Sequence, residues 1–491
     1  MKHLRKPVGL FLILSTSLFL FLLSCSKKKE ESSSTSSTVT CASSRTLTAT
    51  TKVPLLVVRV QYANATFQSN ETTWADKMFG TSDGQLNHYM DETTYSNYQF
   101  TPVTESSGCA DDGVVTVTMS GNHPDSQNYD DERSYDCYAA AAITEADTYV
   151  NFAAYDTDSN DNLSVSELQV IFLVAGGESA TGLNSPGGVW GSAGSLGCDA
   201  DGDGLEAISG EYWMTLDNVS LMGRKDSAYG QNGYSQFGER QGSSSSNNWD
   251  ATIGVMAHEL GHAFFILPDL YDTSAIGAGI GYFGLMGSGS WGKKSSSEKN
   301  GATPVHLSAW SKEKIGACVP QTIDNGTNNI TLPAVYQSSI HAASCGIYKA
   351  TTSTSDEYFL FENRSPGGYD EGLYYKILWG DTNYVPGSIT YFTGGVAIWH
   401  VKDILSSCSN VSTNNCEAQS PKLVDLEEAN NGDLDNGSSK GRTTHLFYSG
   451  NSVTFNNSST PNSKLYDNSS SGISATSISA AGDSMTLTIS K

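Results

Sequence analysis

The residues most able to do chemistry are the five of His258-Glu259-Leu260-Gly261-His262. On a helix, side chains four residues apart lie one turn above each other, so both imidazoles can reach one metal ion. Zinc favours nitrogen ligands, and its catalytic sites use three protein ligands and a water molecule. Zinc lowers the pKa of that water, and Glu259 is placed to accept its proton. The motif predicts zinc ligands at His258 and His262 and a general base at Glu259.

A helix over residues 251–265 must carry this motif, and Asp250 is placed to cap its N-terminus. Four apolar residues recur three or four apart and predict the buried face of this helix: Ile253, Met256, Leu260 and Phe264. Pro268 cannot continue the helix, so the chain is expected to turn there.

The third metal ligand must come from outside the helix. Asp269 follows the turn and can reach back to the metal, and Asp272 is the competing carboxylate. Further along, a glycine-rich segment over residues 284–291 contains Met286. A buried methionine there would form an apolar floor beneath the metal.

A second metal site is predicted in an acidic loop over residues 156–167, which fits the twelve-residue calcium loop. Asp161 replaces the usual turn glycine and tolerates left-handed geometry better than most residues. A strand is predicted directly afterwards, so the calcium would be structural rather than part of a paired sensor. An acidic stretch at residues 199–204 opens similarly but fits less well. The predicted calcium ligands are Asp156, Asp158, Asn160, Asn162 through its backbone carbonyl, Ser164 and Glu167.

Together these motifs resemble the immune inhibitor A family of secreted bacterial zinc metallopeptidases, which are metzincin-like. The family shares the His-Glu-x-x-His motif, a Pro-Asp-x-Tyr-Asp continuation and a methionine turn before a tryptophan. The resemblance implies zinc ligands His258, His262 and Asp269, the base Glu259 and the Met-turn residue Met286.

The resemblance extends over roughly residues 52–491. Segments 74–80, 87–90 and 95–100 resemble the early catalytic domain, and 304–316 resembles its end. Here the stretch from His262 to Asp269 is one residue longer than usual in the family and lacks the family's glycine.

The N-terminus resembles a bacterial lipoprotein signal. A basic start precedes an apolar run, which ends in Leu22-Leu23-Ser24-Cys25. Cleavage before Cys25 would leave that cysteine lipidated, and ordinary secretion is the alternative. We therefore expect a signal peptide at 1–24, a flexible tether at 25–51, a catalytic domain at 52–320 and a β domain at 321–491. The chain would be membrane-anchored in the periplasm or at the cell surface, or released outside the cell.

The composition narrows the functions open to the chain. Its 491 residues carry a formal charge of −24, which excludes a broad electrostatic attraction to nucleic acid. Eight cysteines besides Cys25 favour disulfides in an exported protein. We expect pairs among sequence neighbours: Cys408–Cys416, Cys109–Cys137 and Cys318–Cys345.

The pattern of elements predicts an α+β fold. Buried strands are expected at 54–60 and 168–175, a further strand at 114–119 and a helix at 136–154, whereas 176–250 is expected to be rich in loops. Short strands separated by turns after residue 321 predict an all-β domain, in the form of a sandwich.

Two functions fit the sequence. The first is a zinc endopeptidase that acts on protein or peptide substrates. The second is a catalytically silent surface binding protein that retains the peptidase fold. The presence of Glu259 favours the enzyme.

Overall fold

The computed structural model describes residues 47–124, 134–184, 186–194, 196–198, 212–221, 233–274, 276–337, 345–380, 392–403, 417, 420–430 and 432–491. Five predicted features lie wholly or partly outside these residues: the signal peptide, the lipidated Cys25, the tether at 25–51 as far as residue 46, the acidic stretch at 199–204 and the Cys408–Cys416 pair. Among the described residues, no helix is both long and apolar enough to cross a bilayer. The described residues between Leu47 and Lys491 belong to one compact unit.

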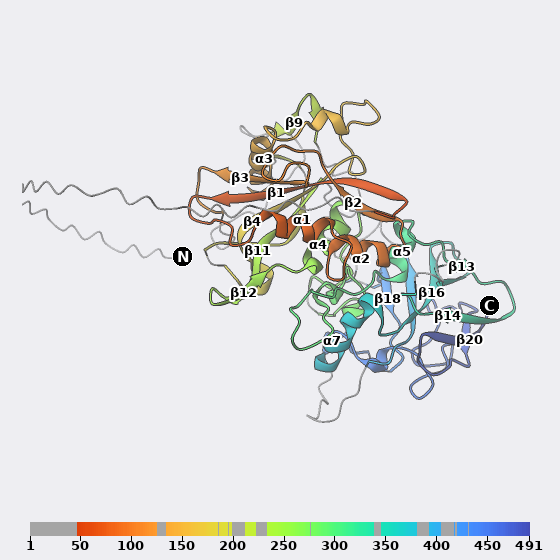
Figure 1. Ribbon diagram of the computed structural model, residues 1–491. Coiled ribbons are helices and arrows are strands. Elements are labelled where there is room, and N and C mark those ends of the chain that lie inside the picture. The colour runs from red at the N-terminus through yellow and green to blue at the C-terminus, as the bar shows by residue number, and fades with distance from the viewer. Residues whose placement is uncertain are drawn as a thin grey trace, which may run out of the picture. The chain divides into compact units, whose positions relative to one another are not determined.

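A largely parallel sheet organises the first half of the chain, with strand order β12-β11-β4-β1-β2 (Figure 1). β1 pairs in parallel with β2 through its first residues and with β3 through its last ones. β4 and β11 continue the parallel order, and β12 closes the edge antiparallel. The strands are β1 (Thr51–Tyr62), β2 (Tyr98–Pro102), β3 (Val114–Met119), β4 (Gln169–Glu178), β5 (Gly188–Val189), β6 (Ser192–Gly194), β11 (Tyr234–Ser244) and β12 (Asn247–Asp250).

The alternation along β1 explains how helices cover both faces of this sheet. Leu55 and Val57 pack in a core with α1 (Glu71–Phe79), α2 (Leu86–Thr93) and α4 (Ile253–Ala263). Leu56 and Val58 point to the other face and pack with α3 (Ser134–Ala146). The smaller elements near α3 are β7 (Gly197–Cys198), β8 (Tyr212–Trp213), β9 (Thr215–Leu216) and β10 (Val219–Ser220). The buried strands predicted at 54–60 and 168–175 are confirmed.

Two sheets form the second half. A five-stranded sheet contains β13 (Gln321–Thr322), β15 (Tyr348–Thr351), β16 (Glu357–Arg364), β17 (Gly395–Lys402) and β18 (Val424–Leu426). A three-stranded sheet contains β14 (Thr327–Pro333), β20 (Ser484–Ser490) and β19 (Ser474–Thr476). Phe359 and Phe361 of β16 share a core with β14 and β20. Leu360 and Trp399 belong to the core that contains α4, so the five-stranded sheet packs on both faces.

The mixture of helices and strands agrees with the predicted α+β class. Leu260 of α4 and Trp399 of β17 belong to one hydrophobic core, which therefore crosses residue 320. The separation of the chain into domains at that residue stays a prediction. Two helices line this contact, α5 (Ala309–Lys314) and α7 (Gly372–Gly380).

A buried ionic network joins the two halves. The guanidinium of Arg364, on β16, is fully buried and donates to both carboxylate oxygens of Asp370, to Glu362 and to the Phe283 carbonyl. Lys312 of α5 lies 3.6 Å from the other oxygen of Glu362. The neighbouring Arg364 charge lowers the pKa of Asp370 against the effect of its burial, so the carboxylate stays ionised.

Two local predictions are corrected, and one disulfide pair agrees with its prediction. The N-cap of α4 is Thr252, whereas Asp250 lies in β12 and pairs with Arg240. Cys137 bonds to Cys198 rather than to Cys109, since α3 packs on β7. The sulfur atoms of Cys318 and Cys345 do lie at bonding distance.

The predicted loop over 176–250 contains the long strand β11, which lies inside the main sheet. Its sequence is rich in Gly, Gln and Ser, which have low strand propensity, and pairing with β4 overrides that preference.

Replacing Arg364 with Met should lower the free energy of unfolding by about 3–5 kcal/mol, because Asp370 and Glu362 would remain buried without their shared cation. Urea unfolding followed by tryptophan fluorescence measures this loss. Arg364→Met combined with Asp370→Asn should lose less than the two single changes added together. A loss below about 1 kcal/mol in Arg364→Met would contradict the role of the network.

Candidate metal centre and active site

The helix α4 places both histidines in the interior. All its residues are buried, and the predicted apolar face packs in the main core. The Nε2 atoms of His258 and His262 lie 3.2 Å apart, one helical turn from each other. Both rings therefore point to one place, as the spacing predicts.

The chain then turns back and brings a carboxylate to the same place. Ile266 adopts a left-handed conformation with φ +56°, and its N–H donates to the His262 carbonyl. Leu267 donates to the Gly261 carbonyl, which makes the turn one residue wider than the usual left-handed cap. The longer stretch that lacks the family's glycine is accommodated in this turn. Asp269 Oδ1 then lies 3.1 Å from each histidine Nε2.

Backbone carbonyls fix the orientation of both rings. His258 Nδ1 lies 3.0 Å from the Leu285 carbonyl, and His262 Nδ1 lies 2.6 Å from the Leu267 carbonyl. Because a carbonyl only accepts, each Nδ1 carries the proton and donates it. Each Nε2 is then left with a lone pair, which is the arrangement that metal-binding histidines use.

The three converging atoms fit a metal ion. Bonds of about 2.0–2.1 Å at tetrahedral angles place zinc ligands about 3.3 Å apart. The three separations here are 3.1, 3.1 and 3.2 Å. Two imidazole nitrogens and one carboxylate oxygen, all acceptors, repel each other unless a cation lies among them. These three residues therefore suit zinc in both chemistry and spacing.

The competing carboxylate is occupied elsewhere. Asp272 Oδ1 accepts from the backbone N–H of Ser274, and Oδ2 accepts from that of Gly277, both at 2.7 Å. These bonds close its own loop. The structure thus brings Asp269, and not Asp272, to the two histidines.

Met286 lies directly against the motif. A Cβ at position 261 would lie 2.4 Å from the Met286 sulfur, so the glycine within the motif provides the space for this side chain. The Met286 carbonyl also accepts from the backbone N–H of Leu270, the residue after Asp269. The glycine-rich turn is therefore in contact with both sides of the candidate metal site, as the floor predicted from sequence would be.

Glu259 is buried beside His258, and both residues line a cavity. Burial, with the charges of Asp269 and Glu178, raises the pKa of Glu259 to about 8, whereas His258 opposes this rise. A divalent cation at the three ligands would favour the carboxylate form. A pKa near neutral suits a group that both accepts and returns a proton.

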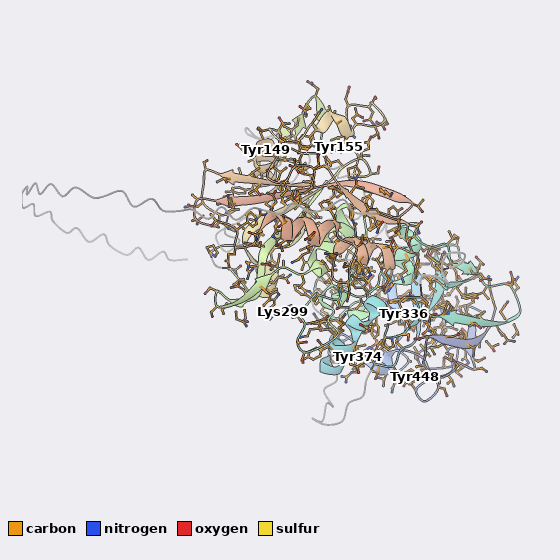
Figure 2. All side chains as sticks on the ribbon, in the orientation of Figure 1. Tyr149, Tyr155, Lys299, Tyr336, Tyr374 and Tyr448 are labelled. Atoms are coloured by element: carbon orange, nitrogen blue, oxygen red, sulfur yellow. A yellow bond between two sulfur atoms is a disulfide. The ribbon has the colours of Figure 1, made fainter. Side chains whose placement is uncertain are left out.

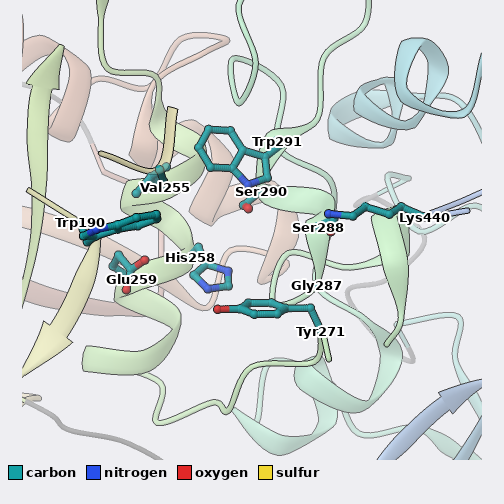
Figure 3. A pocket seen from close by; sticks show the side chains of 12 residues that line it. Trp190, Val255, His258, Glu259, Tyr271, Gly287, Ser288, Ser290, Trp291 and Lys440 are labelled. Carbon is teal, nitrogen blue, oxygen red and sulfur yellow. The ribbon is translucent and has the colours of Figure 1, made fainter. Parts of the chain in front are cut away.

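The cavity above these residues has a volume of about 230 Å³. Figure 3 shows His258 near its middle, with Trp190 and Glu259 on one side and Lys440 on the other. The Tyr271 ring stacks on His258, with centroids 6.1 Å apart. Trp190 is 50% exposed although it is a large aromatic residue, so it is available to contact a ligand.

Sequence reasoning missed Glu178, which supports the wall of the cavity. This fully buried carboxylate ends β4 and accepts from the backbone N–H groups of Ala180, Gly191 and Gly238. It holds the segment that carries Trp190 against β11. Its position at the end of a buried strand was the sequence feature that could have identified it, but two of its partners, Gly191 and Gly238, lie far away along the chain.

The predicted calcium loop folds around its acidic residues. Carboxylate oxygens of Asp156, Asp158 and Glu167 lie within 4.8 Å of one another. Asp161, at the usual glycine position, has φ +59°, which is the left-handed geometry expected there. The backbone N–H of Leu163 donates to the Ser220 carbonyl of β10, so a hydrogen bond joins the loop to this strand.

The loop follows a 3-10 helix that ends at Tyr155, and it lies far from Tyr336 and Tyr448 of the second half (Figure 2).

Comparison with known families gives one match. A family model for the immune inhibitor A peptidase M6 catalytic domain matches residues 180–319, which include α4, Asp269 and Met286. The match confirms the resemblance predicted from the motifs, within this segment. No curated protein matches the chain. Site and match together define a metallopeptidase, which is a hydrolase of proteins or peptides.

The choice of third ligand can be tested with a matched pair. Asp269→Asn should lower zinc affinity by at least about 100-fold. Losing a residue that only hydrogen-bonds to a metal ligand already lowers metal affinity by about 10–100-fold, and Asp269 is a candidate ligand itself. Asp272→Asn should keep its affinity within about threefold of wild type, since Asp272 bonds only its own loop. Competition with a chromogenic chelator measures both. Strong binding by Asp269→Asn with weak binding by Asp272→Asn would reverse the assignment.

Proposed function

We propose that the chain is an exported, lipid-anchored zinc endopeptidase. The observation that carries this proposal is the convergence of His258, His262 and Asp269 on one point, beside a cavity that His258 and Glu259 line. Zinc at that point would act as a Lewis acid that activates water and polarises the substrate carbonyl. Export and anchoring rest on the sequence at Cys25.

The chain's own residues supply the proton transfers and the positioning. Glu259 accepts a proton from the attacking water and gives it to the amine that leaves. The Leu285 and Leu267 carbonyls hold the two imidazoles in the orientation that leaves Nε2 free. Trp190 and Trp291 line the cavity and offer apolar surface to substrate side chains.

The silent binding protein is the weaker candidate. It accounts for the cavity but gives no reason for a buried carboxylate beside the metal ligands. Burying Glu259 costs free energy, since its pKa is raised well above that of an exposed carboxyl group. A general base is the role that this cost supports.

We also propose a structural calcium ion in the loop over residues 156–167. Burial raises the pKa of Glu167, but hydrogen bonds from Ser164 and Thr157 outweigh this effect and bring the pKa to about 2. The carboxylate is therefore charged at neutral pH. The loop's contribution to stability is present above the unfolded pKa near 4.3 and is lost as pH falls towards 2.

Glu259→Gln should lower the rate of casein cleavage by about 10²–10⁴-fold, because proton transfer would be lost while the metal ligands remain. Purified chain with zinc and calcium is assayed beside the variant, and the zinc content of both is measured. Equal cleavage by both proteins would contradict the assigned base. Absence of cleavage by zinc-loaded wild type on any peptide would contradict the peptidase.

Calcium should stabilise the wild-type chain against unfolding by about 2.7 kcal/mol at a concentration 100 times its Kd. Glu167→Gln should lose most of this gain, whereas Glu145→Gln, an exposed carboxylate of α3, should keep it. Thermal melting with and without calcium, at constant zinc, measures the difference. An identical calcium response in Glu167→Gln would contradict the site.

A further inference from the structure

The second half of the chain contributes a charged side chain to the catalytic cavity. Lys440 lines the same cavity as Glu259 and His258. In Figure 3 its amino group points into the cavity, across His258 from Trp190 and Glu259. A peptide lying through the cavity would therefore meet an aromatic ring on one side of the reacting carbonyl and a cation on the other.

The backbone around Lys440 is fixed to the catalytic half. The N–H of Tyr282 donates to the Lys440 carbonyl, and the N–H of Ala278 donates to that of Leu434, both at 2.7 Å. A Cβ at position 281 would lie 2.1 Å from the Lys440 carbonyl oxygen, so Gly281 permits this close contact. The segment that carries Lys440 is thus seated on the loop that leads into the Met286 turn.

Lys293, Lys376 and Lys440 lie close together at the Lys440 end of the cavity. Lys376 donates to the Asn300 side-chain oxygen, and Lys293 lies over the Tyr375 ring. Among the described residues, no carboxylate lies within ion-pairing distance of Lys293, Lys376 or Lys440. Burial, followed by the charges of Lys293 and Lys440, lowers the pKa of Lys376 to about 8.

This local charge contrasts with the chain as a whole. The formal charge of −24 repels acidic ligands at long range, but salt screens that repulsion over about 8 Å at physiological ionic strength. Inside the cavity, the nearest charges determine whether an acidic ligand is attracted or repelled. A ligand that brings a carboxylate to Lys440 gains an ion pair that no carboxylate among the described residues provides.

We propose that the Lys440 end of the cavity binds a carboxylate of the peptide substrate. The Trp190 end then receives an apolar side chain, so cleavage occurs between an apolar residue and a residue that carries a carboxylate. The carboxylate is that of an Asp or Glu side chain or that of the peptide's own C-terminus. This inference rests on the proposed peptidase function, because it names the substrate class of the same site.

The test compares matched peptides cleaved by the full zinc-loaded chain. Peptides with blocked ends carry one Phe and either Asp or Asn at each neighbouring position in turn. We expect kcat/KM to be about fivefold higher for Asp at one position, the scale of an exposed ion pair. Lys440→Gln should bring this ratio to about one, and Lys440→Glu should invert it. A neutral peptide with a free C-terminus, compared with its amide, shows whether the terminal carboxylate is the group bound.

Lys464→Glu is the matched control, because Lys464 is an exposed lysine of the same half that does not line the cavity. It should keep the wild-type ratio. Equal kcat/KM for Asp and Asn peptides and for free and amidated ends would overturn the inference, as would a ratio that Lys440→Glu leaves unchanged.

A binding experiment distinguishes failure of this inference from failure of the proposed peptidase function. If the wild type cleaves no peptide, binding of the same peptides to Glu259→Ala is followed by tryptophan fluorescence. Roughly fivefold tighter binding of a carboxylate peptide, lost in Glu259→Ala combined with Lys440→Glu, supports carboxylate recognition even though the peptidase proposal fails. Equal binding of all peptides would overturn both.

Discussion

The constraint on which the site depends is the meeting of three hydrogen-bond acceptors. His258, His262 and Asp269 present lone pairs to one another at about 3.1–3.2 Å, and both imidazole protons are directed away to carbonyls. Such an arrangement is unfavourable without a cation. The surrounding elements hold this arrangement in place. Helix α4 carries the two imidazole rings, and the turn after it brings the Asp269 carboxylate back to them. The turn that contains Met286 supplies the Leu285 carbonyl, which accepts from His258. The fold therefore holds these three groups in an arrangement that a bound metal ion would stabilise.

The part of this site that could be predicted is local in sequence. The histidines and Glu259 follow from helical spacing, and Asp269 lies within one turn of the chain beyond the helix. The choice between Asp269 and Asp272 needed the structure, because it depends on backbone N–H groups that occupy Asp272. The buried strands β1 and β4 were also predictable, since their runs of apolar residues can hardly be solvated.

Long-range partners could not be predicted. Strand β11 has a polar sequence, and it becomes a strand only because β4 and β12 pair with it on both sides. Glu178 supports the cavity wall through Gly191, and Lys440 lines the cavity, although both lie far from the motif along the chain. The pairing of Cys137 with Cys198 likewise depends on α3 packing near β7, whereas sequence separation favoured Cys109. In each case the deciding contact links residues far apart along the chain.

The second half of the chain, beyond residue 320, helps to hold residues of the site in position. Arg364 of β16 donates to the Phe283 carbonyl, which lies three residues before Met286. The Lys440 carbonyl accepts from Tyr282, the residue before Phe283. Two hydrogen bonds from the second half thus hold adjacent residues of the loop that enters the Met-turn. Because Leu285 in that loop orients His258, movement of the second half would be transmitted to a candidate zinc ligand. Residues beyond 320 therefore belong to the support of the active site, whichever way the chain is divided into domains.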